Sequence, residues 1–236
     1  MKLRTTVVLQ LAALLLALGA SALAATDGYL YVVHGIPGRD VAATDNPGLP
    51  VDVSVSGECL LHGLAFSSTA GPYTLAAGTY DVQVSLANTL APCTNAALVT
   101  SQATVAAEAN ATVVAAISGG EPALLEFVDD LAPVATGSAR FIFVNSADAP
   151  TLKATLTQLD VKNPQTFSVT ANAGAETAIT VPAGYYQVQV VASGSTTVLT
   201  SEDITFDSQS AIFTYAVGEA SNNSVGLINR TIRDVF

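Results

Sequence analysis

The stretch LAAGTYDVQV at residues 75–84 returns as VPAGYYQVQV at residues 181–190, an offset of 106 positions. After the glycine of each copy, apolar and polar side chains alternate, which is typical of a β-strand with one buried face. Two further pairs of blocks recur in the same order along the chain: residues 98–101 with 198–201, and residues 30–35 with 141–146. Matched blocks in one order predict an internal duplication.

The rest of the chain extends this strand pattern. Runs rich in Val, Thr, Ile and Tyr are separated by glycine turn signals, and no segment after the N-terminal region shows a sustained helical stripe. We therefore predict an all-β fold of two tandem immunoglobulin-like antiparallel β-sandwiches, each of about seven strands. The boundary is expected in the small-residue and proline segment 132–137, which few long-range contacts should cross, so that the domains cover residues 26–134 and 137–236.

Each copy of the repeat also predicts a tyrosine corner. Tyr80 and Tyr186 stand at the start of their strands, two residues after Gly78 and Gly184. At this place a tyrosine hydroxyl bonds back to the backbone a few residues upstream. We assign structural roles to these four residues, and we expect neither tyrosine to be catalytic.

The N-terminus has the pattern of a secretory signal. Lys2 and Arg4 precede an apolar run at residues 7–18, and Ala22-Leu23-Ala24 forms an Ala-x-Ala cleavage pattern. We predict a signal peptide over residues 1–24, with an uncleaved membrane anchor over residues 5–25 as the alternative. Cleavage leaves no membrane span in the mature form, which we expect to be secreted or extracytoplasmic, in the periplasm or on the cell surface.

The charge of the chain excludes one large class of partner. Its 236 residues carry 19 acidic and 8 basic side chains, a net charge of −11 that becomes −13 without Lys2 and Arg4. Nucleic acids and anionic lipid headgroups attract proteins that present a positive field. We therefore expect no nucleic-acid partner.

The only two cysteines, Cys59 and Cys93, both lie in the first predicted domain. Paired thiols usually close in the oxidising compartment that an exported chain reaches, so we predict a Cys59–Cys93 disulfide. A zinc site needs about four ligands, and His34 and His62 are the only histidines. No metal site is therefore predicted at these cysteines.

Three stretches of the first predicted domain carry a resemblance to a known family. HGIP at residues 34–37, PVDV at 50–53 and AGTYDV at 77–82 resemble the bacterial domain-of-unknown-function 4397 family. The resemblance implies tandem immunoglobulin-like sandwiches, here two copies, in exported or surface proteins, and it implies no particular activity.

The chain departs from the family pattern in three places. The first domain carries an extra stretch at residues 38–49, and the second has Asn145 where His34 stands and Lys153 where Asp52 stands. An activity that needs this His and Asp could therefore reside only in the first domain.

Few residues of the chain are candidates for catalysis or metal binding. The chain contains no G-x-S-x-G, H-E-x-x-H, C-x-x-C or phosphate-binding glycine motif. A triad pairing His34 or His62 with Asp40 or Asp52 stays open, although His34 before a Gly-x-Pro turn also fits a hydrogen bond that holds a loop. Calcium prefers oxygen ligands, which the extra stretch offers in Asp40, Asp45 and Asn46, but the spacing of a calcium loop is missing.

We therefore predict an exported, non-catalytic module of the cell envelope, acting in adhesion or surface assembly with other envelope or surface proteins as partners. The alternative is a ligand- or calcium-binding domain, or less favourably a hydrolase, that uses His34 and the acidic loop. Either way, no catalytic residue and no cofactor are assigned, and binding is expected on the first domain at one set of residues: His34, Asp40, Asp45, Asn46 and Asp52.

Overall fold

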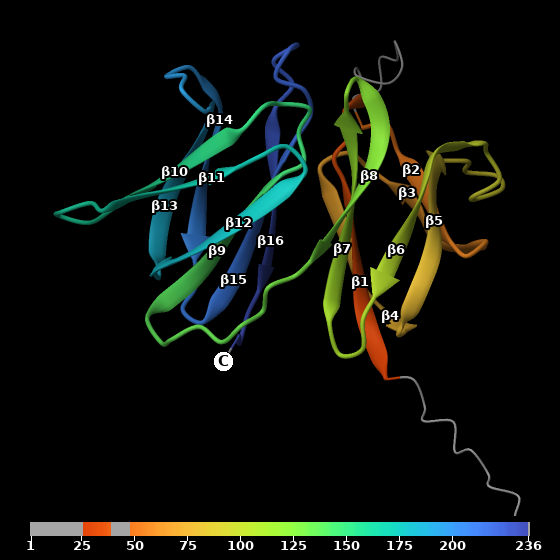
Figure 1. Ribbon diagram of the computed structural model, residues 1–236, viewed down its shortest axis with the longest axis horizontal. Coiled ribbons are helices and arrows are strands. Elements are labelled where there is room, and N and C mark those ends of the chain that lie inside the picture. The colour runs from red at the N-terminus through yellow and green to blue at the C-terminus, as the bar shows by residue number, and fades with distance from the viewer. Residues whose placement is uncertain (1–25, 39–47, 236) are drawn as a thin grey trace, which may run out of the picture.

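The computed structural model describes residues 26–38 and 48–235, so the predicted signal peptide lies outside the described residues. The described chain forms two sandwich-like halves that lie side by side (Figure 1). The strands of the first half are β1 (Asp27–His34), β2 (Val51–Val55), β3 (Glu58–Leu64), β4 (Ser68–Ala76), β5 (Gly78–Leu86), β6 (Ala97–Val105), β7 (Asn110–Ser118) and β8 (Glu121–Val128). Those of the second half are β9 (Ser138–Asn145), β10 (Leu152–Gln158), β11 (Thr166–Ala171), β12 (Ala175–Pro182), β13 (Gly184–Ala192), β14 (Val198–Phe206), β15 (Ser210–Val217) and β16 (Gly226–Ile232).

The two halves have the same topology. The first half contains sheets of order β4-β1-β7-β8 and β3-β2-β5-β6, and the second contains β12-β9-β15-β16 and β11-β10-β13-β14. Adding eight to each strand number of the first half gives the second. The prediction of an all-β sandwich fold is confirmed, with eight strands in each half instead of about seven. One pair in each half, β1–β7 and β9–β15, runs parallel and so departs from the antiparallel prediction.

One of the sequence alignments behind the duplication is wrong by one residue. Val84 pairs with Val99, and its counterpart Val190 pairs with Thr200, so the structure matches Val99 to Thr200 and not to Leu199. A slip of one residue exchanges the two faces of a strand. The shared Thr-Ser dipeptide is thus a coincidence of sequence, whereas the topology supports the duplication.

Each half has a hydrophobic core between its two sheets. Tyr186 is fully buried in the second core and stacks on Phe206, with ring centroids 4.7 Å apart. Its hydroxyl donates to the Pro182 carbonyl at 2.8 Å, and the Tyr80 hydroxyl donates to the Ala76 carbonyl at 2.6 Å. Both hydrogen bonds reach four residues upstream, as expected of a tyrosine corner.

A third core joins the halves, between the sheets that contain β7 and β15. Its members include Val114 of β7 and Ile142, Phe213 and Tyr215 of the second half, all of them buried. The expectation that few long-range contacts cross segment 132–137 is therefore wrong. The domain boundaries at 134 and 137 stay a prediction, and an isolated half would expose this core to water.

The close approach of the halves explains one glycine of the HGIP stretch. A Cβ atom on Gly35 would lie 2.5 Å from Cγ1 of Val217, on β15 of the other half, and 3.0 Å from the Ala115 carbonyl oxygen. Within residues 26–38 and 48–235, the structure contains no helix long and apolar enough to cross a membrane.

Candidate functional site

The loops of the first half meet at one end of its sandwich. His34 ends β1, Asp52 lies near the start of β2, and the β5–β6 loop (residues 87–96) follows β5. Backbone bonds hold these segments together: Ala87 N–H donates to the Pro50 carbonyl at 2.9 Å, and Ser67 N–H donates to the His34 carbonyl at 2.9 Å. This end therefore gathers the candidate residues that the structure describes.

His34 is fully buried, and both of its ring nitrogens have partners. Nε2 lies 2.8 Å from the Leu49 carbonyl oxygen, and the Ile36 N–H points to Nδ1 at 3.4 Å. These partners assign the ring proton to Nε2. Burial lowers the pKa of the imidazole and outweighs the bond to Leu49, which raises it. The ring is thus a neutral group that holds the loop before β2.

Asn145 forms the equivalent hydrogen bond in the second half. Its Nδ2 donates to the Pro150 carbonyl at 3.0 Å, and Pro150 precedes β10 by two residues, as Leu49 precedes β2. The same Nδ2 also donates to the Ala171 carbonyl at 3.2 Å. His34 and Asn145 thus donate equivalent hydrogen bonds at matched positions. This bond needs an N–H donor and does not need an imidazole.

The carboxylate of Asp52 is almost completely buried and accepts three backbone N–H groups. Oδ1 accepts from Gly63 at 2.9 Å, and Oδ2 accepts from Asn88 at 3.0 Å and from Cys93 at 2.8 Å. Burial acts to raise the pKa of this carboxyl. The three N–H groups and nearby His62 outweigh burial, so the pKa lies below its usual value. Asp52 therefore joins β2 to the end of β3 and to the β5–β6 loop.

The predicted disulfide is present: Cys59 of β3 is bonded to Cys93 of the β5–β6 loop, with Cα atoms 5.7 Å apart. It secures the same loop that Asp52 holds. In the second half, exposed Lys153 takes the place of Asp52, and the equivalent connection between β13 and β14 is residues 193–197, which contain no cysteine. The additional support is thus specific to the first half.

A cavity of about 240 Å³ lies beside this support, lined by Asp52, His62, Gly63, Ala87, Asn88, Thr89 and Pro92. Among the described residues, no hydrogen bond joins His34 to Asp52, because each bonds to backbone groups instead. Asp40, Asp45 and Asn46 lie outside the described residues. Within the part of the chain that the structure describes, no group of three or more His, Cys, Asp or Glu side chains is placed to hold a metal.

A second polar cluster lies between the halves and was missed from the sequence. The buried guanidinium of Arg230 donates through Nη2 to Asp129 Oδ2 at 2.7 Å, to the Thr112 hydroxyl at 3.0 Å and to the Tyr215 hydroxyl at 3.1 Å. Burial, which dominates, raises the pKa of Tyr215 to about 12, so its hydroxyl keeps its proton. The signal that could have found the cluster is an arginine within the strand GLINRTI.

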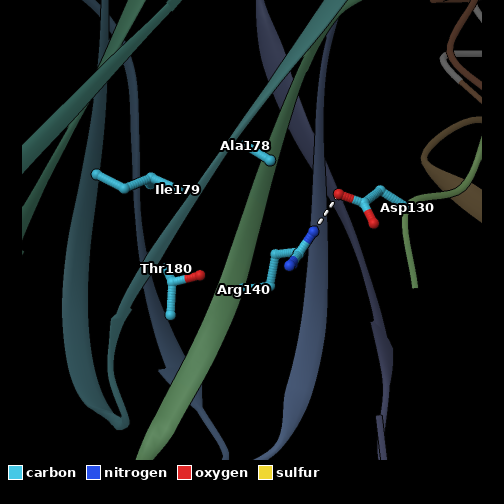
Figure 2. Close-up of a pocket in the computed structure, with 5 residues that line it drawn as sticks. All are labelled: Asp130, Arg140, Ala178, Ile179 and Thr180. Carbon is cyan, nitrogen blue, oxygen red and sulfur yellow. Dashed lines mark hydrogen bonds and ion pairs between the residues drawn. The ribbon is translucent and has the colours of Figure 1, made fainter. Parts of the chain in front are cut away.

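A second ion pair lies at the edge of this cluster, where Arg140 of β9 bonds Asp130 (Figure 2). Figure 2 shows the two side chains facing one another beside Ala178 and Thr180 of β12, while Ile179 points away. These five residues line a cavity of about 250 Å³. Glu176, also on β12, is half-buried; burial first, and then the charges of Asp129 and Asp130, raise its pKa to about 7. This cluster joins the halves, and the Thr112 hydroxyl within it donates to Asp129 Oδ1 at 2.7 Å, with both side chains buried.

Comparison with known proteins yields weak structural likenesses. No curated protein matches the chain. The Bacillus anthracis TIE protein matches at 9% identity and a TM-score of 0.26, over 82% of this chain and 33% of its own, so the chain spans about a third of that protein. A Bacteroides ovatus protein described as a candidate cell adhesion protein matches at 11% identity and a TM-score of 0.30, over 87% and 96% of the two chains. A Bacteroides uniformis protein with the same description matches at 10% identity and a TM-score of 0.27, over 88% and 98%. Likenesses at this level do not bear on function.

The family comparison is more informative. The model of a domain of unknown function, DUF4397, matches residues 28–155, which is more than half of the 236 residues. The match runs from residue 28 in β1 through the rest of the first half and through β9 into β10. It therefore does not coincide with the predicted domains, and a second tandem copy is not confirmed. The chain belongs to the DUF4397 family.

Proposed function

We propose that the chain is an exported, non-catalytic module of the cell envelope or cell surface, which binds another protein through the loop end of its first half. One observation carries the proposal: the side chains best suited to chemistry at this end, His34 and Asp52, are buried and bonded to loop backbone. A catalytic His or Asp has to reach a substrate, whereas these two groups fix the loops. Loops held on a rigid sandwich are a common place for recognition.

The second half supports the non-catalytic part of the proposal. Asn145 replaces His34 and keeps its hydrogen bond, so a residue without acid–base chemistry fills the same place. Lys153 replaces Asp52, and the long, supported β5–β6 loop is replaced by five residues. The replacement of Asp52 and the shorter connection therefore change how one loop is held, and the replacement of His34 keeps the bond.

Two features support export. The closed Cys59–Cys93 bond suits an oxidising compartment, and the sequence at residues 1–24 has the charge, apolar run and small residues of a secretory signal. The periplasm, the cell surface and the medium are all compatible with both features.

Fractionation of the organism that encodes the chain tests the proposal. We expect a mature N-terminus at Ala25, a Cys59–Cys93 disulfide in mass spectra taken without reduction, and saturable binding of the purified mature chain to envelope preparations. A cytoplasmic protein that keeps Met1 and has free thiols would contradict export. Mature protein that shows no saturable binding to envelopes would contradict the binding role.

A further inference from the structure

The outer tip of the β5–β6 loop carries a cluster of exposed apolar side chains. Leu90 is 96% exposed, the most exposed of the large hydrophobic side chains that the structure describes, and Ala91 and Pro92 beside it are also exposed. We call these three residues the apolar tip. Figure 1 shows the loop extending away from the body of the first half, between β5 and β6. Because Leu90 packs against almost nothing, the stability of the fold does not explain it.

The backbone that presents the apolar tip is nevertheless held by side chains on both sides. Asn88 Oδ1 accepts the N–H groups of Leu90 and Ala91, each at 3.1 Å, and Asn88 Nδ2 donates to the Thr94 hydroxyl at 3.0 Å. Thr94 in turn donates to the Ala91 carbonyl at 2.7 Å, and Asn95 Nδ2 donates to the Leu86 carbonyl at 3.0 Å.

These bonds add to the disulfide at Cys93 and to the Asp52 carboxylate, which accepts the N–H groups of Asn88 and Cys93. The loop is therefore ordered before any partner arrives. Binding through such a loop loses less conformational entropy than binding through a mobile one.

The second half supplies an internal comparison. Its equivalent connection, residues 193–197, reads Ser-Gly-Ser-Thr-Thr and has neither an apolar side chain nor a cysteine. The sandwich therefore closes without the apolar tip. The first half instead has a longer loop at the same place, and a disulfide and a buried carboxylate both hold that loop.

The charge distribution indicates what the tip contacts. Residues 82–107 contain no Asp, Glu, Lys or Arg, in a chain whose net charge is −11. The centres of protein–protein interfaces are depleted of charged residues and rich in buried apolar anchors. Insertion into a lipid surface is favoured by Lys, Arg and Trp around the apolar residues, and this segment has none of them.

We propose that the apolar tip is the anchor of a protein–protein interface and that Leu90 inserts into an apolar pocket on a partner protein of the cell envelope. This inference rests on the proposed function and specifies the surface used. The Cys59–Cys93 disulfide and Asp52 position the tip and do not contact the partner.

The test compares three full-length variants for binding to envelope preparations of the organism that encodes the chain. Leu90→Asp places a charge at the tip, Leu90→Met keeps its apolar character, and Thr196→Asp makes the matched change in the exposed loop of the second half. Because Leu90 and Thr196 are exposed, we expect all three to fold, which thermal melting checks. We expect Leu90→Asp to weaken binding at least tenfold, and the other two variants to stay within about twofold of the wild type, as an anchor residue predicts.

Two further probes identify the class of partner. Binding of the wild type should be lost on envelopes treated with protease and absent on vesicles made from lipids of the same cells. Equal binding by Leu90→Asp, or binding to the lipid vesicles, would overturn the inference and leave the proposed function standing. Absence of binding by the wild type would overturn the proposed function itself.

Discussion

Arg230 of β16 lies 2.7 Å from Asp129, the residue that follows β8, and this buried ion pair crosses from one half of the molecule to the other. The guanidinium is stacked between two rings, with its carbon 4.0 Å from the centroid of Tyr31 and 4.3 Å from that of Phe213. Tyr31 belongs to the first half and Phe213 to the second. One side chain thus links both halves by charge and by ring contacts, inside the core that they share.

We predict that Arg230→Met destabilises the whole described chain in a single cooperative transition. Removing one partner of a buried ion pair leaves the other charge unpaired, which costs about 3 to 5 kcal/mol. Urea unfolding followed by circular dichroism measures the loss. Arg233→Met is the matched control, because its ion pair with Asp207 is exposed and such pairs contribute about 0 to 1 kcal/mol. Two separate transitions, with only the second half affected, would show that the halves are not coupled.

His34 should tolerate asparagine better than alanine. His34→Ala leaves the buried Leu49 carbonyl without its donor, at a cost of about 1 to 3 kcal/mol, and it also leaves a gap beside Phe66. His34→Asn can restore the bond as Asn145 does, so we expect it to recover part of the lost free energy of unfolding. The role of His34 as a holder of the loop is wrong if asparagine is no better than alanine.

Glu176 should make the protein less stable as the pH rises towards 8. Its pKa is raised from 4.5 to about 7, so the folded state binds this proton more tightly than the unfolded state does. The stabilisation is fully present below pH 4.5 and is lost as the pH rises through about 7. The cationic groups nearby, Arg140 and Arg230, are already paired with Asp130 and Asp129.

Glu176→Gln should raise the melting temperature at pH 8. The melting temperature of this variant should also change less between pH 5 and pH 8 than that of the wild type. Comparison with the wild type at each pH cancels the effect of His34, whose lowered pKa destabilises the fold as the pH falls below 6.5. Glu121→Gln, at the exposed start of β8, is the control. If the melting temperature of Glu176→Gln depends on pH as strongly as that of the wild type, Glu176 is not the group responsible.

The disulfide should stabilise the protein by about 3 to 4 kcal/mol, because it crosslinks residues 34 positions apart and so restricts the unfolded chain. We expect the Cys59→Ala, Cys93→Ala double variant to melt at a lower temperature, still in one transition, since the shared core couples the halves. Calorimetry measures both the melting temperature and the number of transitions. A fall confined to the first half, with the second melting unchanged, would instead favour independent domains.

Much of the fold could be predicted from the sequence, because its signals are local. The alternation in the repeat places β5 and β13, and the Gly-x-Tyr spacing predicts the hydrogen bonds of Tyr80 and Tyr186. The contact between the halves was missed, although β7 and β15 are continuous apolar runs, a pattern of strands buried on both faces.

The candidate site was harder to predict, because it depends on hydrogen bonds between distant segments. Asp52 lies 36 and 41 residues from the N–H donors Asn88 and Cys93, and no spacing in the sequence brings them together. The pairing of His34 with Asp52 looked like chemistry, yet both side chains bond to loop backbone. The exposure of Leu90 follows from the path of the β5–β6 loop, which its composition does not determine.

Asp52 holds the β5–β6 loop as a preformed surface through the N–H groups of Asn88 and Cys93. Amide hydrogen exchange at Asn88 and Cys93 measures this support, in the wild type and in Asp52→Asn, which replaces one acceptor oxygen by an NH₂ group. We predict strong protection of both amides in the wild type and a large loss of protection in the variant, with the amides of β7 unchanged. Exchange of both wild-type amides at the rate of an unstructured peptide would contradict this role of Asp52.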